Sequence, residues 1–299
     1  MTRKCRALFL MVALLDLRCW AAQTPVISSD QDAIGAQTPA SESDKPLWEF
    51  GLGAGVLTLP DYRGSDHIFV YGLPVPYFVY RGKFLKADRN GLRGSFFDSD
   101  RVEVSLDTNA SLPVKSENDE ARSGMPDLRP TVEVGPSVNL KLWSTTAQDV
   151  RLDLRLPVRT ALTVESSPHD VGWIFSPRLN LDIRKVRGLP GWNVGFLVGP
   201  LISSRRYDSY YYSVAEPFAR PDRAAYQAPG GYGGTQFVVA LSKRYTSWWL
   251  GAFMRADTLS HASFVDSPLV RSRHYLAAGI ALVRVFEASS RLVPASDDQ

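Results

Sequence analysis

Alternation of apolar and polar side chains is the feature that most constrains how this chain can fold. From residue 150 to residue 159, aliphatic residues alternate strictly with charged residues and one proline: Val150, Leu152, Leu154, Leu156 and Val158 against Arg151, Asp153, Arg155, Pro157 and Arg159. Successive side chains of an extended strand point to opposite faces. The segment therefore predicts a strand that is aliphatic on one face and charged on the other.

The same period of two recurs from Pro46 almost to Phe286, and no long segment has a convincing period of 3.6 residues. Such segments predict an all-β fold of about twelve antiparallel strands. We place the strands at 47–57, 72–80, 83–88, 91–97, 101–110, 129–143, 148–164, 172–185, 191–203, 235–245, 247–257 and 272–286. Because the third and fourth are short, ten to fourteen strands remain possible.

A soluble sandwich and a transmembrane barrel both produce this alternation, with opposite faces toward water. Three features favour the barrel: an N-terminal export signal, polar faces that mix Arg, Asp, Glu and Asn, and turns that alternate in length. The long connections are 58–71, 111–128, 165–171, 204–234 and 258–271, and short turns separate them. We therefore predict an antiparallel transmembrane β-barrel with short turns and both termini on the periplasmic side.

The N-terminal residues predict export. An apolar run over 7–15 follows Arg3, Lys4 and Arg6, which is typical of a signal peptide, here over residues 1–22. A polar segment without periodicity, 23–45, predicts a flexible periplasmic leader. The barrel is expected over 46–286 and a C-terminal tail over 287–299, in the outer membrane of a Gram-negative cell.

Charge and cysteine content exclude some classes of protein. The chain has 34 Lys and Arg against 31 Asp and Glu, and the signal region holds four of the basic residues and one of the acidic residues. The mature chain then has no net charge, so nothing indicates nucleic-acid binding. Both cysteines, Cys5 and Cys19, lie in the signal region, and no disulfide is expected in the mature protein.

Several stretches, in this order, resemble the MipA/OmpV family of Gram-negative outer-membrane proteins. They are GLGAGVLTLPDYRGSDH, PVPYFVYRGKFL, MPDLRPTVEVGPSV, YQAPGGYGGTQFVVALSKRY and WWLGAFMRADTLSHASFVDSPLVRSRHYLAAGIALVRVF. The resemblance covers residues 48–286 and implies a monomeric barrel that contacts outer-membrane lipid and lipopolysaccharide. It also implies an envelope scaffold that interacts with a periplasmic murein hydrolase and a murein synthase. Other members are discussed as surface antigens, adhesins or pores, and the family brings no established catalytic residues.

The charged faces of two predicted strands supply candidate lumen residues. They are Arg151, Asp153, Arg155, Arg159, Arg178, Asp182 and Arg184. One interpretation is a pore that attracts small anionic solutes. The other is a lumen filled by salt bridges, because a lone buried charge is costly.

The segment 204–234 supplies candidate interaction residues in an outer loop. They are Arg205, Arg206, Tyr207, Tyr210, Tyr211, Tyr212, Tyr226 and Tyr232. Tyr and Arg are enriched at binding hot spots, and basic and aromatic side chains together could bind sugars or lipopolysaccharide phosphates. The alternative is an aromatic girdle at the membrane interface with a loop packed on the barrel rim.

The sequence contains no catalytic motif of the G-x-S-x-G, H-E-x-x-H or C-x-x-C type. Its four histidines, His67, His169, His261 and His274, are scattered, so we expect no metal site and no cofactor. Adjacent Asp and His residues at 66–67 and 169–170 leave a hydrolytic site as a remote alternative. We expect an envelope scaffold rather than an enzyme, with a small-solute pore or a surface adhesin as the alternatives.

Overall fold

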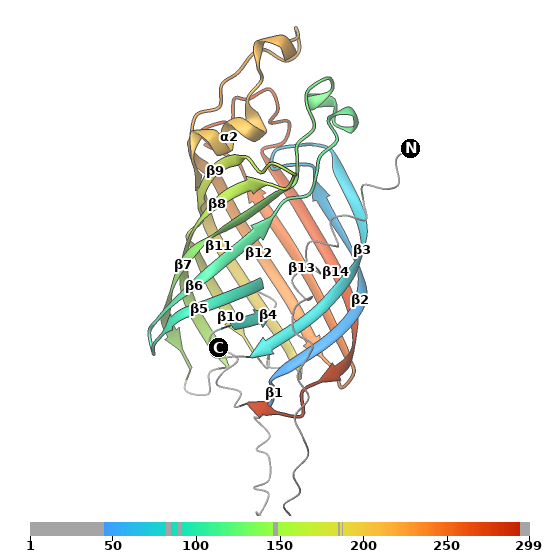
Figure 1. The fold of residues 1–299 in the computed structure, drawn as a ribbon, viewed down its shortest axis with the longest axis vertical. Coiled ribbons are helices and arrows are strands. Elements are labelled where there is room, and N and C mark those ends of the chain that lie inside the picture. Colours follow the sequence, from blue (N-terminus) through green and yellow to red (C-terminus); the bar gives the residue numbers. More distant parts are fainter. Residues whose placement is uncertain are drawn as a thin grey trace, which may run out of the picture. The chain divides into compact units, whose positions relative to one another are not determined.

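The computed structural model describes residues 45–81, 85–88, 91–145, 149–184, 186 and 188–293, all within the compact unit Glu42–Gln299. Antiparallel strands dominate this unit and wind around a barrel (Figure 1). Among the described residues, no helix has the length and apolar composition that crossing a membrane requires. The predicted signal peptide over 1–22, most of the leader 23–45 and the last six residues of the tail lie outside the described residues.

The barrel consists of one antiparallel sheet whose last strand pairs with its first. Its strands are β2 (Trp48–Pro60), β3 (Ile68–Arg81), β4 (Leu85–Asp88), β5 (Gly91–Asp98), β6 (Val102–Ala110), β7 (Thr131–Ser144), β8 (Val150–Thr163), β9 (Asp170–Phe175), β10 (Arg178–Ile183), β11 (Trp192–Ser203), β12 (Gly231–Arg244), β13 (Trp248–Thr258) and β14 (His274–Ala288). Strand β14 pairs with β2 from Ala278↔Thr58 to Ala288↔Glu49, which closes the ring.

The predicted strand 172–185 is present but interrupted. Strands β9 and β10 both pair with β8 on one side and with β11 on the other. Ser176 and Pro177 separate the two strands, and proline cannot donate a backbone hydrogen bond to the ladder. The described residues therefore form twelve positions around the ring, in agreement with the predicted number.

Two strands begin four residues earlier than predicted. Strand β3 begins at Ile68 and β12 at Gly231. In β12 the backbone φ is 140° at Gly231 and 95° at Gly234, values that favour glycine. These glycines let the strand continue through a stretch that the sequence predicts as loop, opposite a register shift between Pro200 and Ile202 of β11.

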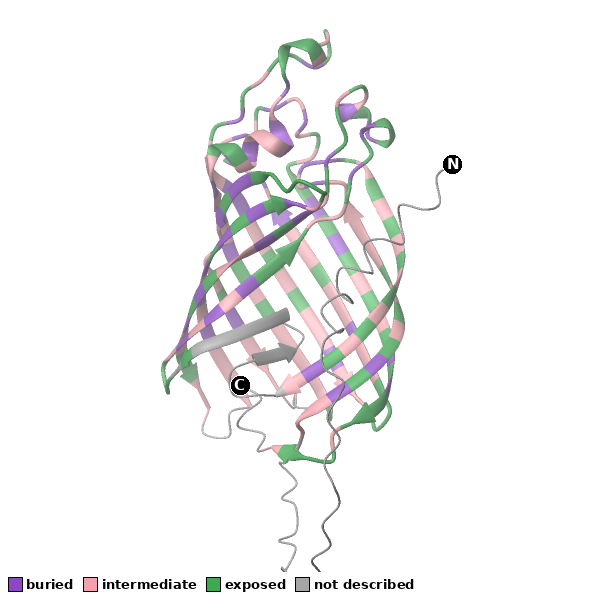
Figure 2. Cartoon of the chain, in the orientation of Figure 1, coloured by how far each residue is buried: buried purple, intermediate pink, exposed green. Residues whose placement is uncertain are grey.

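The burial pattern is the inverse of a soluble sheet (Figure 2). Outward aliphatic residues are widely exposed, including Leu52 at 53%, Val70 at 66% and Ile280 at 56%. Inward polar residues are shielded, including Glu133 at 3% and Arg159 at 4%. An apolar exterior around a polar interior is the arrangement of a transmembrane barrel, because lipid replaces water at the outer face.

The two ends of the barrel differ. At one end the connections are short, and a small ribbon forms from β1 (Lys45–Pro46) and β15 (Leu292–Val293). At the other end four long connections, 61–67, 111–130, 204–230 and 259–273, pack together and are called the cap below. The cap contains α2 (Arg205–Tyr212) and three 3-10 turns, Ser116–Asn118, Glu120–Arg122 and Glu216–Phe218.

Candidate functional site in the barrel lumen

One side of the lumen carries charged and amide side chains and is called the charged wall. It is formed by inward residues of β6, β7, β8 and β10: Glu103, Asp107, Glu133, Asn139, Asp153, Arg155, Arg159, Arg178, Asn180 and Asp182. Strict alternation in these strands places every second residue on this wall. Six of the seven predicted lumen residues thus lie on the lumen-facing side of β8 and β10, and Arg184 follows the end of β10.

Arginine 159 lies at the centre of the charged wall. Its Nη1 is 2.6 Å from Oδ1 of Asp107 on β6, and its Nε is 2.9 Å from Oε2 of Glu133 on β7. The other oxygen of Asp107 is 2.6 Å from Nη2 of Arg178 on β10. Two arginines and two carboxylates from four strands therefore neutralise one another.

Charged and amide residues nearer the short-turn end of the charged wall also form pairs. The Nε of Arg151 is 2.8 Å from Oδ2 of Asp153, and the strand register places Asp182 directly opposite Arg151. On β7, Nδ2 of Asn139 donates to the hydroxyl of Ser105 at 2.9 Å. Of the predicted lumen charges, Arg151, Asp153, Arg159 and Arg178 thus take part in ion pairs.

The opposite side of the lumen has small and apolar side chains and is called the apolar wall. Its inward residues come from β2, β3, β13 and β14: Gly51, Gly53, Gly55, Leu57, Leu73, Val75, Trp249, Gly251, Phe253, Ala277, Gly279 and Ala281. Two of the glycines lie under aromatic rings. A Cβ at Gly251 would be 2.0 Å from the Trp249 ring, and one at Gly279 would be 2.6 Å from the Phe253 ring. Each ring therefore packs directly on the backbone of a glycine, because any other residue would place a Cβ in the space that the ring occupies.

A second charge cluster joins the apolar wall to the cap. Asp257 on β13 accepts from Nε of Arg63 and from Nε of Arg255, each at 2.7 Å, and from Oη of Tyr275 at 2.5 Å. Arg63 comes from the connection after β2, and its Nη1 also donates to the carbonyl of Gly233 at 2.7 Å. This cluster therefore connects the 61–67 connection of the cap with β12, β13 and β14.

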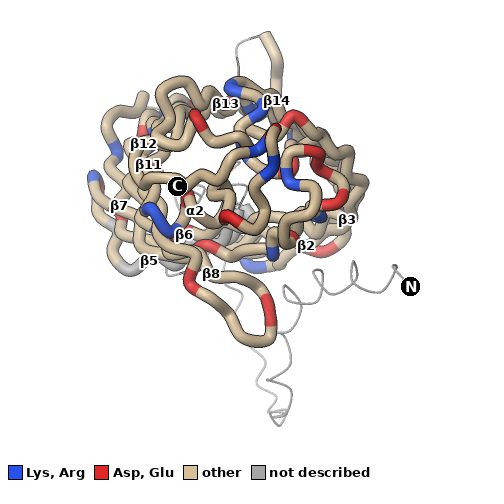
Figure 3. The backbone as a smooth tube through the Cα atoms, turned by 90° about the horizontal axis from the view of Figure 1, so that it is seen from above, with Lys and Arg blue, Asp and Glu red and all other residues tan. Residues whose placement is uncertain are grey.

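The cap has an apolar core of its own. It is formed by Tyr62, Val114, Ala121, Leu128, Tyr211, Tyr212, Val214, Ala228, Leu259, Ala262, Phe264 and Leu269, with residues from all four long connections. The rings of Tyr212 and Phe264 stack with their centroids 3.7 Å apart. Viewed from above, α2 lies within the ring of strands (Figure 3). The cap thus forms a packed roof over the lumen.

Helix α2 connects this roof to the charged wall. Ser204 caps its N-terminus by accepting from the backbone N–H of Tyr207 at 3.2 Å, and Oη of Tyr207 donates to Glu133 at 3.0 Å. Asp208 is 1% exposed and accepts from the Ser203 hydroxyl at 2.6 Å. Burial raises the pKa of the Asp208 carboxyl to about 7, although the Ser203 hydrogen bond and the charge of Arg63 oppose the increase.

The predicted outer-loop residues occupy different environments. Tyr211 and Tyr212 are buried in the cap core, while Tyr207 and Tyr210 pack against it. Tyr226 pairs through its backbone with Val214. Tyr232 lies in β12 with its Oη 2.6 Å from Oγ1 of Thr235. Arg205 and Arg206 are exposed, and they contact Gln227 and Asp170 respectively.

Some residues of the site were not singled out from the sequence. Asp107 and Glu133 were visible on polar strand faces, but their pairing with Arg159 depends on strand register. Arg255 and Asp257 follow Phe253 at steps of two residues in β13, so alternation places all three on the inward face. This pattern could have identified the two charged residues from the sequence. Serine is a common helix N-cap, so Ser204 is a signal for the start of α2. The helix has only eight residues, which is too short for a clear helical period in the sequence.

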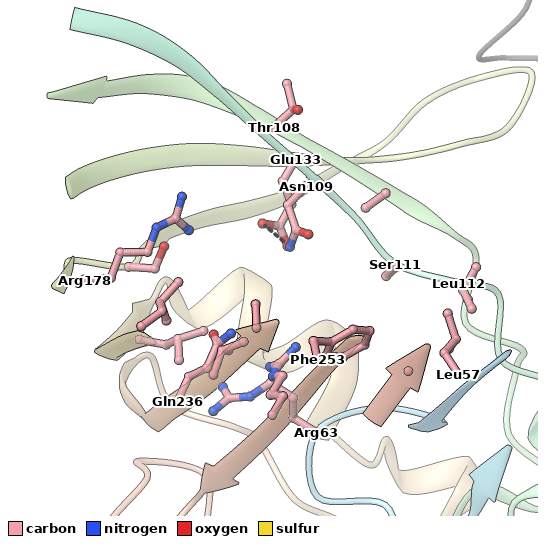
Figure 4. A pocket seen from close by; sticks show the side chains of 18 of the residues that line it. Leu57, Arg63, Thr108, Asn109, Ser111, Leu112, Glu133, Arg178, Gln236 and Phe253 are labelled. Carbon is pink, nitrogen blue, oxygen red and sulfur yellow. Dashed lines mark hydrogen bonds between the residues drawn. The ribbon is translucent and has the colours of Figure 1, made fainter. Parts of the chain in front are cut away.

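A cavity of about 840 Å³ lies between the two walls and beneath the cap. Figure 4 shows Glu133 and Arg178 on one side of it and Gln236 and Phe253 on the other. Tyr212 and Phe264 line it at the cap end, and Ser242 and Trp249 line it near the 245–247 turn. The cavity therefore extends through much of the barrel and can accommodate a small molecule.

A family model described as "MltA-interacting protein MipA" matches residues 52–286. The chain belongs to this family. The matched range begins in β2 and ends in β14, so the MipA match covers the complete ring of strands. An apolar exterior, a polar interior and this family together identify an outer-membrane β-barrel of the MipA type.

No curated protein matches this MipA-family chain by sequence. Among solved structures, "Bacterial polysaccharide outer membrane secretin" has a TM-score of 0.37 and 10% identity, over 81% of this chain and 99% of the other. "CymD monoaromatic hydrocarbon channel" has a TM-score of 0.35 and 12% identity, over 81% and 89%. The Ralstonia pickettii toluene transporter TbuX has a TM-score of 0.22 and 12% identity, over 83% and 71%. At these TM-scores the likenesses carry no functional argument.

Proposed function

We propose that this protein is an envelope scaffold whose lumen is closed at the long-loop end and whose partners are murein enzymes. The observation that carries the proposal is the packed cap, in which Tyr212 and Phe264 stack above the lumen. The paired charges around Arg159 add to it, because they occupy the lumen without leaving that arginine uncompensated. A barrel built in this way is suited to interaction rather than to free diffusion.

The partner side in this proposal is the short-turn end, expected to face the periplasm. Short turns offer little area, whereas a standard interface buries about 800 Å² on each partner. The leader 23–45 and the tail 287–299 would supply the remaining surface. Pairing of Lys45 with Val293 and of Pro46 with Leu292 brings the ends of these two segments together. The description of the matched family, which names an MltA-interacting protein, supports a murein hydrolase as the partner.

A binding assay with a purified lytic transglycosylase of the murein-hydrolase class tests this function. We expect capture by the full-length protein in nanodiscs and loss of capture when 23–45 is deleted. A matched control carries Arg205→Ala and Arg206→Ala at the opposite end and should retain capture. Equal capture with and without the leader, or no capture by the full-length protein, would contradict the proposal.

A small-solute pore is the second candidate, favoured by the cavity of about 840 Å³. Planar-bilayer recording separates it from a closed scaffold. We expect no reproducible conductance steps from the intact protein. Steps that disappear when Arg151, Arg155 and Arg159 are neutralised would establish the pore instead.

A surface adhesin is the third candidate, favoured by the exposure of Arg205 and Arg206. Because Tyr211 and Tyr212 belong to the cap core, deleting the whole loop would also damage the fold. The Arg205→Ala, Arg206→Ala variant is therefore the better test. If this variant binds host cells as well as the wild type does, the two exposed arginines are not needed for adhesion. That result would contradict the adhesin candidate.

The outward apolar face is expected to contact outer-membrane lipid, with lipopolysaccharide at the long-loop end. We propose that the protein acts as a monomer in this membrane, since the ring closes within a single chain. Light scattering of the nanodisc-embedded protein checks the number of chains per barrel.

A further inference from the structure

We propose that the lumen cavity is a binding site for an uncharged saccharide, which enters from the short-turn end. The site is the space between the charged wall and the apolar wall, with the cap as its roof. The inference is independent of the scaffold function, because it depends only on the residues that line the cavity.

The first argument concerns polar atoms that line the cavity. Three of them belong to residues that are at least nine-tenths buried, and they have no hydrogen-bond partner among the described residues: Oγ of Ser176, Oδ1 of Asn180 on β10 and Oδ2 of Asp208 on α2. Buried polar atoms normally have a partner, because leaving one unsatisfied costs about 1–3 kcal/mol. A ligand that supplies hydrogen bonds at these three positions would satisfy this requirement.

The chemistry of these atoms indicates hydroxyl groups. The Asn180 carbonyl oxygen needs a donor, whereas the Ser176 hydroxyl can donate or accept. A hydroxyl group can play either role, so several hydroxyls on one molecule match a mixed set of this kind. A purely apolar ligand would leave all three atoms unsatisfied.

The second argument concerns charge. Around the cavity, Arg159 contacts Asp107 and Glu133, Arg178 also contacts Asp107, and Arg63 and Arg255 both contact Asp257. The residues that line the cavity include five arginines and five acidic residues, so the lining as a whole is balanced. A charged ligand would have to compete with these ion pairs, and separating a buried pair is costly. An uncharged polar ligand can instead hydrogen-bond at the edges of the pairs without breaking them.

The third argument concerns the apolar wall. The rings of Trp249 and Phe253 lie over Gly251 and Gly279 on this side of the cavity. Both ring residues line the cavity, and their strand β13 is separated from β10, the strand of Asn180, by β11 and β12. Sugar rings have hydroxyls at their edges and apolar C–H groups on their faces, so they suit a site with hydrogen-bonding groups on one side and aromatic rings on the other.

The size and position of the cavity agree with this ligand. A volume of about 840 Å³ lies within the roughly 300–1,000 Å³ of small-molecule sites. The stacked Tyr212 and Phe264 cover the long-loop end, whereas the lining residues Ser242 and Trp249 lie close to the 245–247 turn. The ligand is therefore expected to enter from the short-turn end.

Equilibrium dialysis with the full-length protein in lipid nanodiscs tests the site, with maltose and N,N′-diacetylchitobiose as neutral probes. We expect saturable binding of at least one probe. Asn180→Leu should weaken this binding about fivefold, the equivalent of one lost hydrogen bond. Phe253→Leu should weaken it by a similar factor through the lost aromatic face.

The neighbouring outward residues provide matched controls. Leu179→Ala and Met254→Leu change residues beside Asn180 and Phe253 that face away from the lumen, and both should leave the affinity unchanged. Heat-modifiable gel mobility shows that each variant is folded. Absence of saturable binding to the folded wild type overturns the proposal, as does equal weakening by the outward and the inward variants.

The same experiment distinguishes a charged amphiphile from a saccharide. Octanoate serves as the anionic probe, with an apolar chain and no hydroxyl groups. Saturable binding of octanoate that is sensitive to Phe253→Leu, without binding of either sugar, would assign the cavity to an amphiphilic anion and overturn the saccharide proposal.

Discussion

The two walls of the lumen are built from strands with the same outward face and very different inward faces. On β8 the inward residues include Asp153, Arg155 and Arg159, whereas on β14 they include Ala277 and Gly279. Both strands present aliphatic residues to the outside. Lipid therefore imposes a single requirement on the exterior, and the interior is free to differ from one side to the other.

The difference also shows how each wall is stabilised. The charged wall depends on pairing between strands, as when Arg159 contacts Asp107 on β6 and Glu133 on β7. The apolar wall depends on the absence of side chains, as when Gly279 leaves room for the Phe253 ring. Substitutions should therefore damage the first wall by removing a group and the second by adding one.

The largest effect is expected from breaking the charged wall with Arg159→Met. The substitution leaves Asp107 and Glu133 buried without this arginine, at a cost of about 3–5 kcal/mol. Urea titration followed by gel mobility measures the free energy of unfolding. Arg284→Met, which removes an outward charge on β14, is the control and should cost less than about 1 kcal/mol. Equal losses in the two variants would show that pairing within the lumen does not stabilise this wall.

A smaller effect is expected from filling the apolar wall with Gly279→Val. The added Cβ would lie 2.6 Å from the Phe253 ring, so the ring must move toward the cavity, at a cost of about 1–3 kcal/mol. The same urea titration measures this loss. Gly72→Val is the matched control on β3, because a Cβ there meets no atom within 4 Å. If both valine variants are as stable as the wild type, the Phe253 ring does not require a glycine at position 279, and the prediction is wrong.

The smallest effect is expected at Asp208, a buried carboxyl of α2 that contacts Ser203 on β11. Ionisation can cost no more than the free energy of opening the cap, because an opened cap exposes this carboxyl to water. The folded pKa of about 7 lies above the ordinary aspartate pKa of about 3.9, so the folded state binds more protons between these pH values. Cap stability should therefore be highest below about pH 4 and fall as the pH rises toward 7. Asp208→Asn should remove this slope.

Limited proteolysis of the 204–230 segment between pH 4 and pH 8 measures cap opening. Asp222→Asn changes an exposed carboxyl in the same loop and serves as the control. An identical pH slope in the wild type and in Asp208→Asn would assign the dependence to another group.

Much of the ring could be predicted from the sequence because alternation is a local property. The approximate strand intervals and the lipid-facing side of Leu52 follow from the order of neighbouring residues, although β3 and β12 begin earlier than predicted and 172–185 is divided into β9 and β10. Charge made the β8 face conspicuous, so Arg151, Arg155 and Arg159 could be identified as lumen residues. The glycines at 251 and 279 gave no comparable signal, since a glycine in a strand does not indicate which ring will cover it.

Sequence alone determined the antiparallel strands, their two faces and the alternation of short turns with long connections, because these follow from a period of two and from turn composition. Only the tertiary structure decided that Arg159 is paired, that Tyr211 and Tyr212 are buried in a cap, and that Arg63 reaches Asp257. The last contact joins residues 194 positions apart. Such contacts depend on the register at which the ring closes and on loops that fold over it, and neither is encoded in any short stretch of the chain.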